Sequence, residues 1–274
     1  MSAPPSTAPA KRSPYRPDLL AGYTALVTGG GTGMGRAMAL AFADHGADVV
    51  VASRKKEHLD PVAEEIRKRG RRALAVPVDV RDFARVEALR DEIEREFGAL
   101  DILVNNAAGN FLAPVSDLSP NGWNAVVNIV LTGTFHVSKA MLPLLEKRAG
   151  RASVTNIIAT YAYAAAPLVA HSGAAKAGVL NLTRSLALEW AHRGIRVNAI
   201  APGPVDTEGA SSHLFPTPEI KDRILSTVPL SRFAEADEIA HAAVYLASDA
   251  ASYVTGDCLI IDGGLSWSTR FLGE

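Results

Sequence analysis

The chain has 274 residues, of which 48% are hydrophobic and 21% charged, with a formal net charge of −1. These values predict a chain that buries a large core, and they argue against a disordered protein or a nucleic-acid partner. The apolar runs fall short of the roughly 18 residues that cross a bilayer, so no membrane span is expected. The single cysteine, Cys258, excludes an internal disulfide and favours a reducing, cytoplasmic location.

The two ends of the chain carry no recognisable targeting signal. Residues 1–17 are rich in Pro, Ser and Ala, and their apolar stretch is too short and too often broken by Pro for a signal peptide. We expect a flexible tail there. The last four residues, Phe271–Glu274, match no peroxisomal address. Residues 18–274 are expected to form one domain, because the sequence shows neither an internal repeat nor a sign of a second domain.

Short runs rich in β-branched residues alternate with helical patterns along the whole domain. Several runs are apolar at nearly every position, as strands buried on both faces are. Between them, the apolar residues of Asp82–Phe97 recur at steps of 3, 4 and 4, which indicates a helix. This alternation predicts a single Rossmann-type α/β domain: a doubly wound parallel sheet of about seven strands with helices on both faces. The predicted strands are Thr24–Thr28, Asp48–Ala52, Ala73–Val80, Ile102–Asn105, Ser153–Ile158, Val197–Ala201 and Cys258–Asp262.

A glycine-rich turn joins the first predicted strand to the following helix. Gly29, Gly33 and Gly35 give the spacing G-x-x-x-G-x-G. Glycines permit a tight turn and a close approach of the backbone to a pyrophosphate, whose charge is favoured at a helix N-terminus. The context of strand, turn and helix favours a dinucleotide site over a glycine-rich turn without a ligand. The predicted site is lined by Gly29, Thr32, Gly33 and Met34.

The end of the second predicted strand indicates which dinucleotide binds. Enzymes that use NAD usually carry an acid about 20 residues past the glycines, whereas this strand is followed by Arg54, Lys55 and Lys56. The Arg54 guanidinium can hydrogen-bond to a 2′-phosphate. A charge-assisted contact of about 1.5–3 kcal/mol would favour NADPH over NADH roughly 10- to 150-fold. The alternative is a solvated basic helix start. Asp79, after the third strand, is a candidate for the adenine amine or a turn-forming residue.

Further motifs follow along the chain: Asn105–Gly109, Asn128 with Thr132–Phe135, Arg196–Asn198, Pro202–Pro204, Thr255–Gly256 and Asp262–Gly264. Together with the glycine turn, they resemble the short-chain dehydrogenase/reductase family over nearly the full length. The resemblance implies a homotetramer, and Asn128 is either a backbone and water ligand near Lys176 or purely structural. It also implies cofactor contacts from Val80, Asn106, Ala107, Lys176, Pro202 and Gly203, beside those of Arg54, Lys55 and Asp79.

The chain departs from this family at the usual acid. A Tyr normally stands four residues before the Lys and a Ser thirteen residues before that Tyr, but these positions hold Ser172 and Ala159. The pattern resembles the enoyl-thioester branch of the family. Asn110-Phe111 resembles the 2,4-dienoyl-CoA reductases, and Pro167–Lys176 resembles both these and the peroxisomal trans-2-enoyl-CoA reductases.

Two tyrosines are candidates for the displaced acid. The mitochondrial-type dienoyl reductases carry a Tyr fifteen residues before the Lys, here Tyr161, and the peroxisomal enoyl reductases one thirteen before, here Tyr163. We favour Tyr161, because it lies just past the carboxyl end of a predicted strand, where such sheets bind ligands. By the resemblance, Tyr161 and Asn110 donate to the thioester oxygen, where one donor contributes about 2.7–4 kcal/mol. Lys176 holds the nicotinamide ribose, and Ser172 bonds the cofactor or a water.

The expected activity is NADPH-dependent reduction of a conjugated C=C in an enoyl- or 2,4-dienoyl-CoA, with acyl chain length left open. The alternatives are a 3-oxoacyl or other carbonyl reductase that uses Tyr161 or Tyr163, and a non-catalytic NADP(H)-binding protein. Residues 205–233 are the least regular and form a candidate substrate lid. His171 either lines the pocket or is structural, and the other histidines show no metal-ligand spacing, so no metal is expected.

Overall fold

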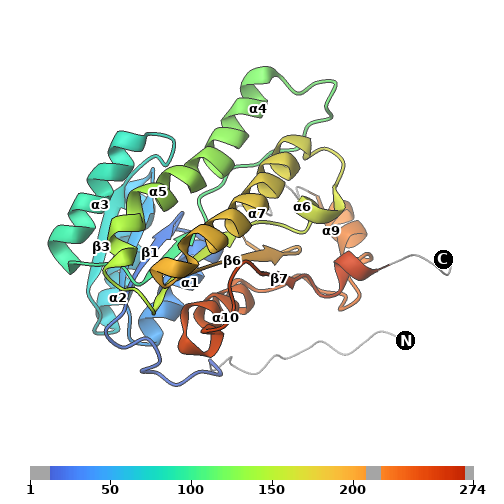
Figure 1. Ribbon diagram of the computed structural model, residues 1–274. Coiled ribbons are helices and arrows are strands. Elements are labelled where there is room, and N and C mark those ends of the chain that lie inside the picture. The colour runs from blue at the N-terminus through green and yellow to red at the C-terminus, as the bar shows by residue number, and fades with distance from the viewer. Residues whose placement is uncertain (1–12, 208–216, 269–274) are drawn as a thin grey trace.

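The computed structural model describes residues 13–207 and 217–268, which contain a seven-stranded, fully parallel sheet (Figure 1). The strand order is β3-β2-β1-β4-β5-β6-β7, so the predicted doubly wound sheet is confirmed. The strands are β1 (Thr24–Thr28), β2 (Asp48–Ser53), β3 (Ala73–Pro77), β4 (Ile102–Asn105), β5 (Ala152–Ile157), β6 (Ile195–Pro202) and β7 (Cys258–Ile261).

The third strand is shorter than the sequence predicts. It ends at Pro77, although the Val78 N–H still donates to the Ser53 carbonyl oxygen over 2.8 Å. The Asp79 side chain then accepts from the Arg81 N–H (3.0 Å) and turns the chain out of the sheet. Apolar residues therefore continue past the point at which strand pairing stops.

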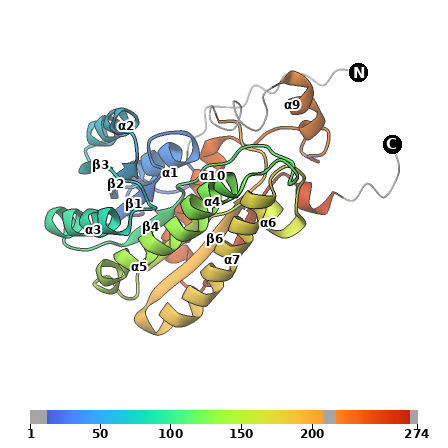
Figure 2. The same ribbon diagram turned by 90° about the horizontal axis from the view of Figure 1, so that it is seen from above.

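Helices cover both faces of the sheet (Figures 1 and 2). The helices α1 (Gly33–Asp44), α2 (Lys56–Lys68) and α10 (Ala236–Ala247) share one apolar core cluster, and α3 (Phe83–Phe97), α5 (Gly133–Glu146) and α7 (Ala170–Trp190) share another on the opposite face. The remaining described helical segments are α4 (Pro120–Val127), the π-helix η1 (Asn128–Thr132), α6 (Tyr161–Ala164), η2 (Ala191–Arg193), α9 (Pro218–Leu225), η3 (Asp249–Ala251) and η4 (Leu265–Trp267).

Residues Pro120–Glu146 run as one helix through α4, η1 and α5 and are long and apolar enough to span a membrane by length and composition. Its α5 portion is packed into the domain: Val137, Met141 and Leu144 are buried in the core cluster shared with α3 and the sheet. The burial of this face in the core accounts for the apolar composition of the helix.

The chain changes direction across the sheet between β1 and β4. It runs from β1 outward to β2 and β3, and then returns to place β4 on the other side of β1. Open α/β sheets bind ligands at such a switch point, beyond the carboxyl ends of the strands. The glycine turn after β1 and the Asn105–Asn110 segment after β4 both lie at this edge.

The two segments predicted to be irregular are only partly described. Of the predicted tail, residues 1–12 lie outside the described residues, while Tyr15 donates its hydroxyl to the His241 carbonyl (3.1 Å) on α10. Of the predicted lid at 205–233, residues 208–216 lie outside them. The rest includes α9 and a single parallel bridge between Val205 and Ala234. A lid function for this segment stays a prediction.

Candidate active site

The glycine turn presents the N-terminus of α1 to solvent. Gly29 has a φ of +64°, which bends the chain sharply out of β1. Thr32 is the N-cap, with extended backbone and no capping hydrogen bond from its side chain, and both Thr32 and Gly33 are exposed. The first N–H groups of any helix have no intrahelical acceptor. Here they form a cradle suited to a pyrophosphate. Met34, in the first turn, instead packs partly buried against the core.

Gly35 lets the turn and the end of β4 approach each other closely. A Cβ at this position would lie 2.6 Å from Asn106 Nδ2 and still closer to the Gly29 carbonyl oxygen. The Asn106 amide in turn donates to the Thr28 (3.0 Å) and Gly29 (3.3 Å) carbonyl oxygens. Asn106, predicted as a cofactor ligand, thus holds the turn in place through its side chain.

We expect the Gly35→Ala variant to bind dinucleotide roughly 10- to 150-fold more weakly, the loss of about one charge-assisted hydrogen bond, because the added methyl group pushes the turn away from its position. A fluorescence titration with NADPH measures this affinity. Gly70→Ala is the control: a Cβ at Gly70 meets nothing within 4 Å, although Gly70, unlike Gly35, has a positive φ. It should lose some stability and keep full affinity. Equal affinities for both variants would contradict the prediction.

The threonine at the end of β1 locks the two strand ends together. The Thr28 hydroxyl donates to the Val104 carbonyl (3.2 Å) and accepts from the backbone N–H groups of Asn106 (3.0 Å) and Ala107 (3.1 Å). Ala107 is therefore placed beside the turn, and its cofactor contact stays a prediction. Thr28 itself was missed as a positioning residue, although its place before the first glycine is the signal that could have found it.

Arg54 and Lys55 lie exposed after β2, on the same edge as the turn. Lys55 comes within 4.0 Å of Glu57. The Asp79 carboxylate pairs with the Arg81 guanidinium at 2.5 Å, and this contact, followed by smaller contributions that include Arg54, lowers the Asp79 pKa. Asp79 therefore forms a turn with Arg81, and its contact with the adenine amine stays a prediction.

Tyr161, Ser172 and Asn110 meet at the carboxyl ends of β4 and β5. The Tyr161 hydroxyl and Ser172 Oγ are hydrogen-bonded at 3.1 Å. Burial raises the Tyr161 pKa, and contacts with Ser172 and then Asn110 offset part of that rise. Asn110 Oδ1 accepts from the Phe111 N–H (2.9 Å), whereas its buried Nδ2 has no hydrogen-bond partner of good geometry in the described chain. Two donors, a phenol and an amide, therefore share one pocket.

Lys176 lies at the end of β5. Its side chain is buried, and its ammonium group donates to the Ile157 carbonyl oxygen at the end of β5 over 2.5 Å. Burial lowers the Lys176 pKa from 10.5 to about 8. Lys176 lies one helical turn after Ser172 on α7, so both belong to one face of the helix.

The second candidate tyrosine lies in different surroundings. Tyr163 is 44% exposed, and its pKa is raised first by burial and then by its contact with Cys258 on β7. The structure brings Tyr161, and not Tyr163, to Ser172. Asn128 begins the π-helical turn η1, is exposed, and accepts at 3.5 Å from the Thr132 hydroxyl. π-helical turns are frequent at functional sites.

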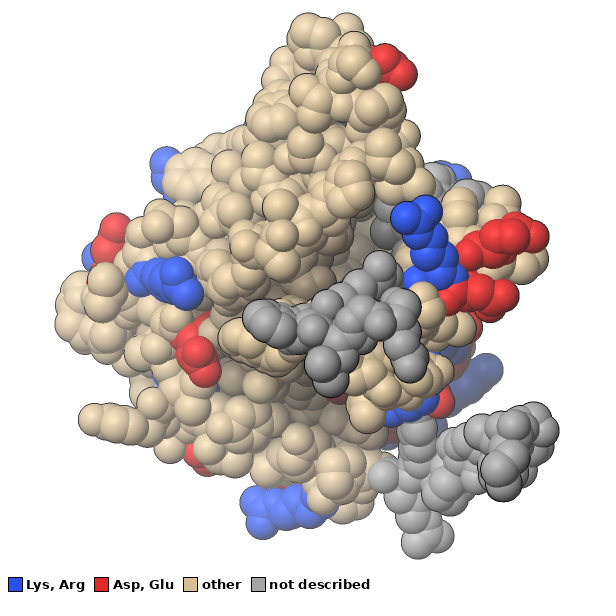
Figure 3. Space-filling model, turned by 90° about the vertical axis from the view of Figure 1, so that its right-hand side faces the viewer, with Lys and Arg blue, Asp and Glu red and all other residues tan. Residues whose placement is uncertain are grey.

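The other predicted cofactor contacts lie on the same edge of the sheet. Val80 is buried against Gly133 at the start of α5. Pro202 ends β6, and the Gly203 N–H donates to the Ile261 carbonyl (2.8 Å). Seen from the carboxyl ends of the strands, the described surface is largely uncharged, with most Lys and Arg toward its rim (Figure 3).

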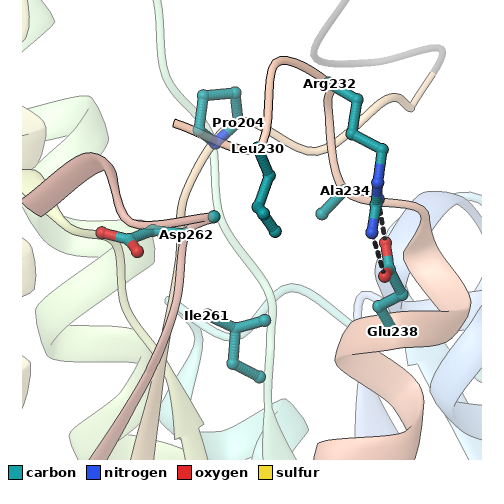
Figure 4. Close-up of a pocket in the computed structure, with 8 residues that line it drawn as sticks. Pro204, Leu230, Arg232, Ala234, Glu238, Ile261 and Asp262 are labelled. Carbon is teal, nitrogen blue, oxygen red and sulfur yellow. Dashed lines mark hydrogen bonds and ion pairs between the residues drawn. The ribbon is translucent and has the colours of Figure 1, made fainter. Parts of the chain in front are cut away.

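A small pocket opens beside this site, past the ends of β6 and β7. Arg232 and Glu238 form a two-pronged ion pair across one wall, with distances of 2.7 and 2.8 Å (Figure 4). None of the predicted catalytic residues lines this pocket. Its lining residues are Pro204, Leu230, Arg232, Ala234, Glu238, Ile261, Asp262 and Gly263.

Known proteins are similar to this chain in sequence and fold. A family model described as "Enoyl-(Acyl carrier protein) reductase" matches residues 29–266. The probable 2,4-dienoyl-CoA reductase of Bacillus subtilis, described as (2E)-enoyl-CoA-producing, is 45% identical over 240 residues, which are 87% of this chain and 94% of that protein. The peroxisomal 2,4-dienoyl-CoA reductase of Arabidopsis thaliana is 42% identical over 266 residues, covering 94% of this chain and 89% of the relative.

Two solved structures extend the comparison. A short chain dehydrogenase from Bacillus anthracis superposes with a TM-score of 0.85 at 44% identity and covers 92% of this chain and 99% of its own. A gluconate 5-dehydrogenase from Burkholderia cenocepacia, in complex with NADP and tartrate, gives 0.87 at 35% identity, with coverages of 92% and 98%. The chain therefore belongs to the short-chain dehydrogenase/reductase family of oxidoreductases, whose members typically bind NAD(P).

Proposed function

We propose that this oxidoreductase reduces a conjugated C=C of a 2,4-dienoyl- or enoyl-CoA with NADPH. The observation that carries the proposal is the meeting of the Tyr161 hydroxyl with Asn110, beside Ser172 where the family usually has its acidic Tyr. Relatives at 42–45% identity that are named as 2,4-dienoyl-CoA reductases support the same reaction.

The paired donors suit a conjugated thioester. Reduction of the C=C places negative charge on the thioester oxygen, and preorganised donors around that oxygen lower the barrier. Because burial raises its pKa, Tyr161 stays protonated at neutral pH and can donate. The Asn110 Nδ2 group supplies the second donor, and its buried hydrogens have no well-placed acceptor within the described chain. Lys176, one helical turn after Ser172, adds a positive charge at the end of β5.

The residues present fit a bound NADP(H). The α1 N-terminus and the close approach at Gly35 form a cradle for the pyrophosphate. Arg54, exposed after β2, provides a cation for a 2′-phosphate, and Lys176 would hold the nicotinamide ribose. When bound, NADPH supplies the hydride. The chain's own part is to orient the thioester, to exclude water and to hold a proton at Tyr161.

A substrate panel tests the proposal. Purified protein is mixed with NADPH and, in turn, with crotonyl-, decenoyl- and decadienoyl-CoA and with a 3-oxoacyl-CoA, and absorbance at the NADPH band is followed. We expect oxidation of NADPH with at least one enoyl- or dienoyl-CoA. Turnover of the 3-oxoacyl-CoA alone would support a carbonyl reductase instead, and tight NADPH binding without any turnover would support a non-catalytic binding protein.

The cofactor preference has its own prediction. Replacing Arg54 with Ala should weaken NADPH binding about 10- to 150-fold, the size of one charge-assisted contact, and leave NADH binding unchanged. Parallel titrations with both cofactors measure the ratio. Lys56→Ala is the matched control, because Lys56 is committed to Asp60 at 2.8 Å along its own helix. An equal effect of Arg54→Ala on both cofactors would contradict a 2′-phosphate contact.

A further inference from the structure

A surface without charged side chains adjoins the proposed donor pair. Residues 102–116, which include Asn110, and residues 152–175, which include Tyr161, contain no Lys, Arg, Asp or Glu. The helix α4 and the loop before it form the projection at the top of Figures 1 and 3, and that projection is almost free of charged side chains. A charged ligand would find few partners on this side of the site.

Three apolar side chains are partly exposed on this surface. Phe111, Leu112 and Leu168 are 36%, 38% and 44% exposed, and we call them the apolar wall. Phe111 and Leu112 directly follow Asn110 in the sequence. Leu168 lies in the loop between α6, which carries Tyr161, and α7. Because these side chains are open to solvent and adjoin the donor pair, a ligand bound to that pair can reach them.

The two segments that form the apolar wall are held together. The Ala113 N–H donates to the Leu168 carbonyl oxygen over 2.9 Å. The Phe111 ring packs against the ring of His171, which has no exposed surface, at a centroid distance of 4.5 Å. A Cβ at Gly122, in the first turn of α4, would lie 3.1 Å from Phe111 Cζ, so the ring is also held by α4. The wall is therefore preorganised, and His171 supports it from within the fold.

Leu168 has a backbone conformation that disfavours folding. Its φ is +67°, in the left-handed region that glycine adopts freely and other residues adopt rarely. A glycine would remove this cost, and burial does not explain the leucine, because the residue is nearly half exposed. Residues held in such conformations are concentrated at functional sites. A contact that is completed only by a bound ligand accounts for a leucine at this position.

The substrate of the proposed reaction has one part that matches such a wall. Tyr161 and Asn110 bind the thioester oxygen, and the coenzyme A on the sulfur side is polar and charged. Beyond the conjugated double bonds lies a hydrocarbon tail without a polar atom. Each methylene group that leaves water for an apolar surface strengthens binding by up to about fourfold. Such a tail needs neither hydrogen bonds nor charges from the protein.

We propose that Phe111, Leu112 and Leu168 form the binding site of the acyl tail, and that they make the enzyme prefer dienoyl-CoA substrates whose tail extends well beyond the diene. This inference rests on the proposed function, because it presupposes an acyl-thioester substrate. The Asn110 side chain binds the thioester oxygen, and the two residues that follow it cover the tail. One segment therefore recognises both the carbonyl group and the chain length.

Two substrates that share the reacting diene test the proposal. The acyl group of 2,4-hexadienoyl-CoA ends one carbon past the diene, and 2,4-decadienoyl-CoA adds four methylene groups. We expect wild-type kcat/KM to be about 15- to 200-fold higher for the longer substrate, the effect of covering about two to four methylene groups. The difference should lie in KM, because the tail is bound equally before and during the reaction.

Two variants of the apolar wall should weaken this preference. Leu168→Gly removes one side chain and suits the positive φ, and we expect the ratio of the two kcat/KM values to fall about 4- to 15-fold, the contribution of about one or two methylene groups. Leu112→Ala should lower the ratio in the same direction and leaves the loop before α7 unchanged. In both variants kcat/KM for hexadienoyl-CoA should stay near the wild-type value.

Leu188→Ala is the matched control. Leu188 is also an exposed leucine, but it lies in the last turn of α7, about 24 Å along the helix axis from Ser172. This variant should keep the wild-type ratio. Sedimentation velocity on all preparations should give the wild-type coefficient, since the apolar wall is assigned to the substrate and not to contact between copies of the chain.

The outcomes separate the tail site from the proposed function. A wild-type ratio near one, an unchanged ratio in both wall variants, or equal losses with both substrates would each overturn the tail site. A shift of the wall variants to smaller species with an unaltered ratio would also overturn it and assign the wall to contact between copies. A wild-type enzyme that oxidises NADPH with no acyl-CoA at all would instead overturn the proposed function itself.

Discussion

Replacing Tyr161 with Phe is expected to lower kcat for a dienoyl-CoA by about 10²- to 10³-fold, the usual effect of losing one donor from an oxyanion-binding pair. The change removes only the hydroxyl oxygen that contacts Ser172 at 3.1 Å and lies beside Asn110. Lys176 and the glycine turn are untouched, so NADPH affinity should remain within a few-fold of wild type. Steady-state kinetics and a cofactor titration on the same preparation measure both effects.

Tyr163→Phe is the matched control for this prediction. Tyr163 lies two residues further on in α6, and its side chain contacts Cys258 instead of Ser172. We expect its kcat to stay within about twofold of wild type, as for a surface substitution away from the reaction. A large loss in Tyr163→Phe with little change in Tyr161→Phe would reverse the assignment, and equal large losses would indicate that α6 must be intact as a unit.

The fold was predictable because its signals are local and repeated. Each strand is a short apolar run, and each intervening helix shows its own period, as in Asp82–Phe97. The boundaries were less predictable where apolar sequence outlasts strand pairing. Val78 and Val80 look like strand residues, but the side chain of Asp79 turns the chain between them.

The site was predictable only in part. The candidates Tyr161, Lys176 and Asn110 came from the resemblance to the dienoyl and enoyl reductases. The choice between Tyr161 and Tyr163 depends on how α6 turns each side chain after β5, which residue spacing does not encode. The roles of Asn106 and Thr28 in holding the glycine turn arise from the pairing of β1 beside β4, a contact between residues about 78 positions apart. His171 was ambiguous for the same reason, because nothing in the sequence shows that its ring is buried against Phe111.

Lys176 provides a prediction about pH. In the cofactor-free protein its pKa is about 8, so the ammonium group is charged below that pH and neutral above it. Because kcat/KM for NADPH reports the ionisations of the free enzyme, we expect this parameter to fall about tenfold per pH unit above about pH 8. Tyr161 and His171 do not titrate in this range, because the Tyr161 pKa is raised above 10 and the His171 pKa is lowered below 6.5.

The Lys176→Met variant separates charge from packing at this position. Methionine keeps most of the side-chain length and removes the ammonium group, so kcat/KM should drop roughly 10- to 150-fold at pH 7, the effect of one charged hydrogen bond, and the limb above pH 8 should vanish. The pH dependence of stability gives a second test. Between pH 8 and 10.5 the unfolded wild-type chain binds more protons at Lys176 than the folded one does. The free energy of unfolding of wild type should therefore rise with pH relative to that of Lys176→Met. Denaturant melts at pH 7.5 and 10 measure this difference, and a limb that persists unchanged in Lys176→Met would show that another group titrates there.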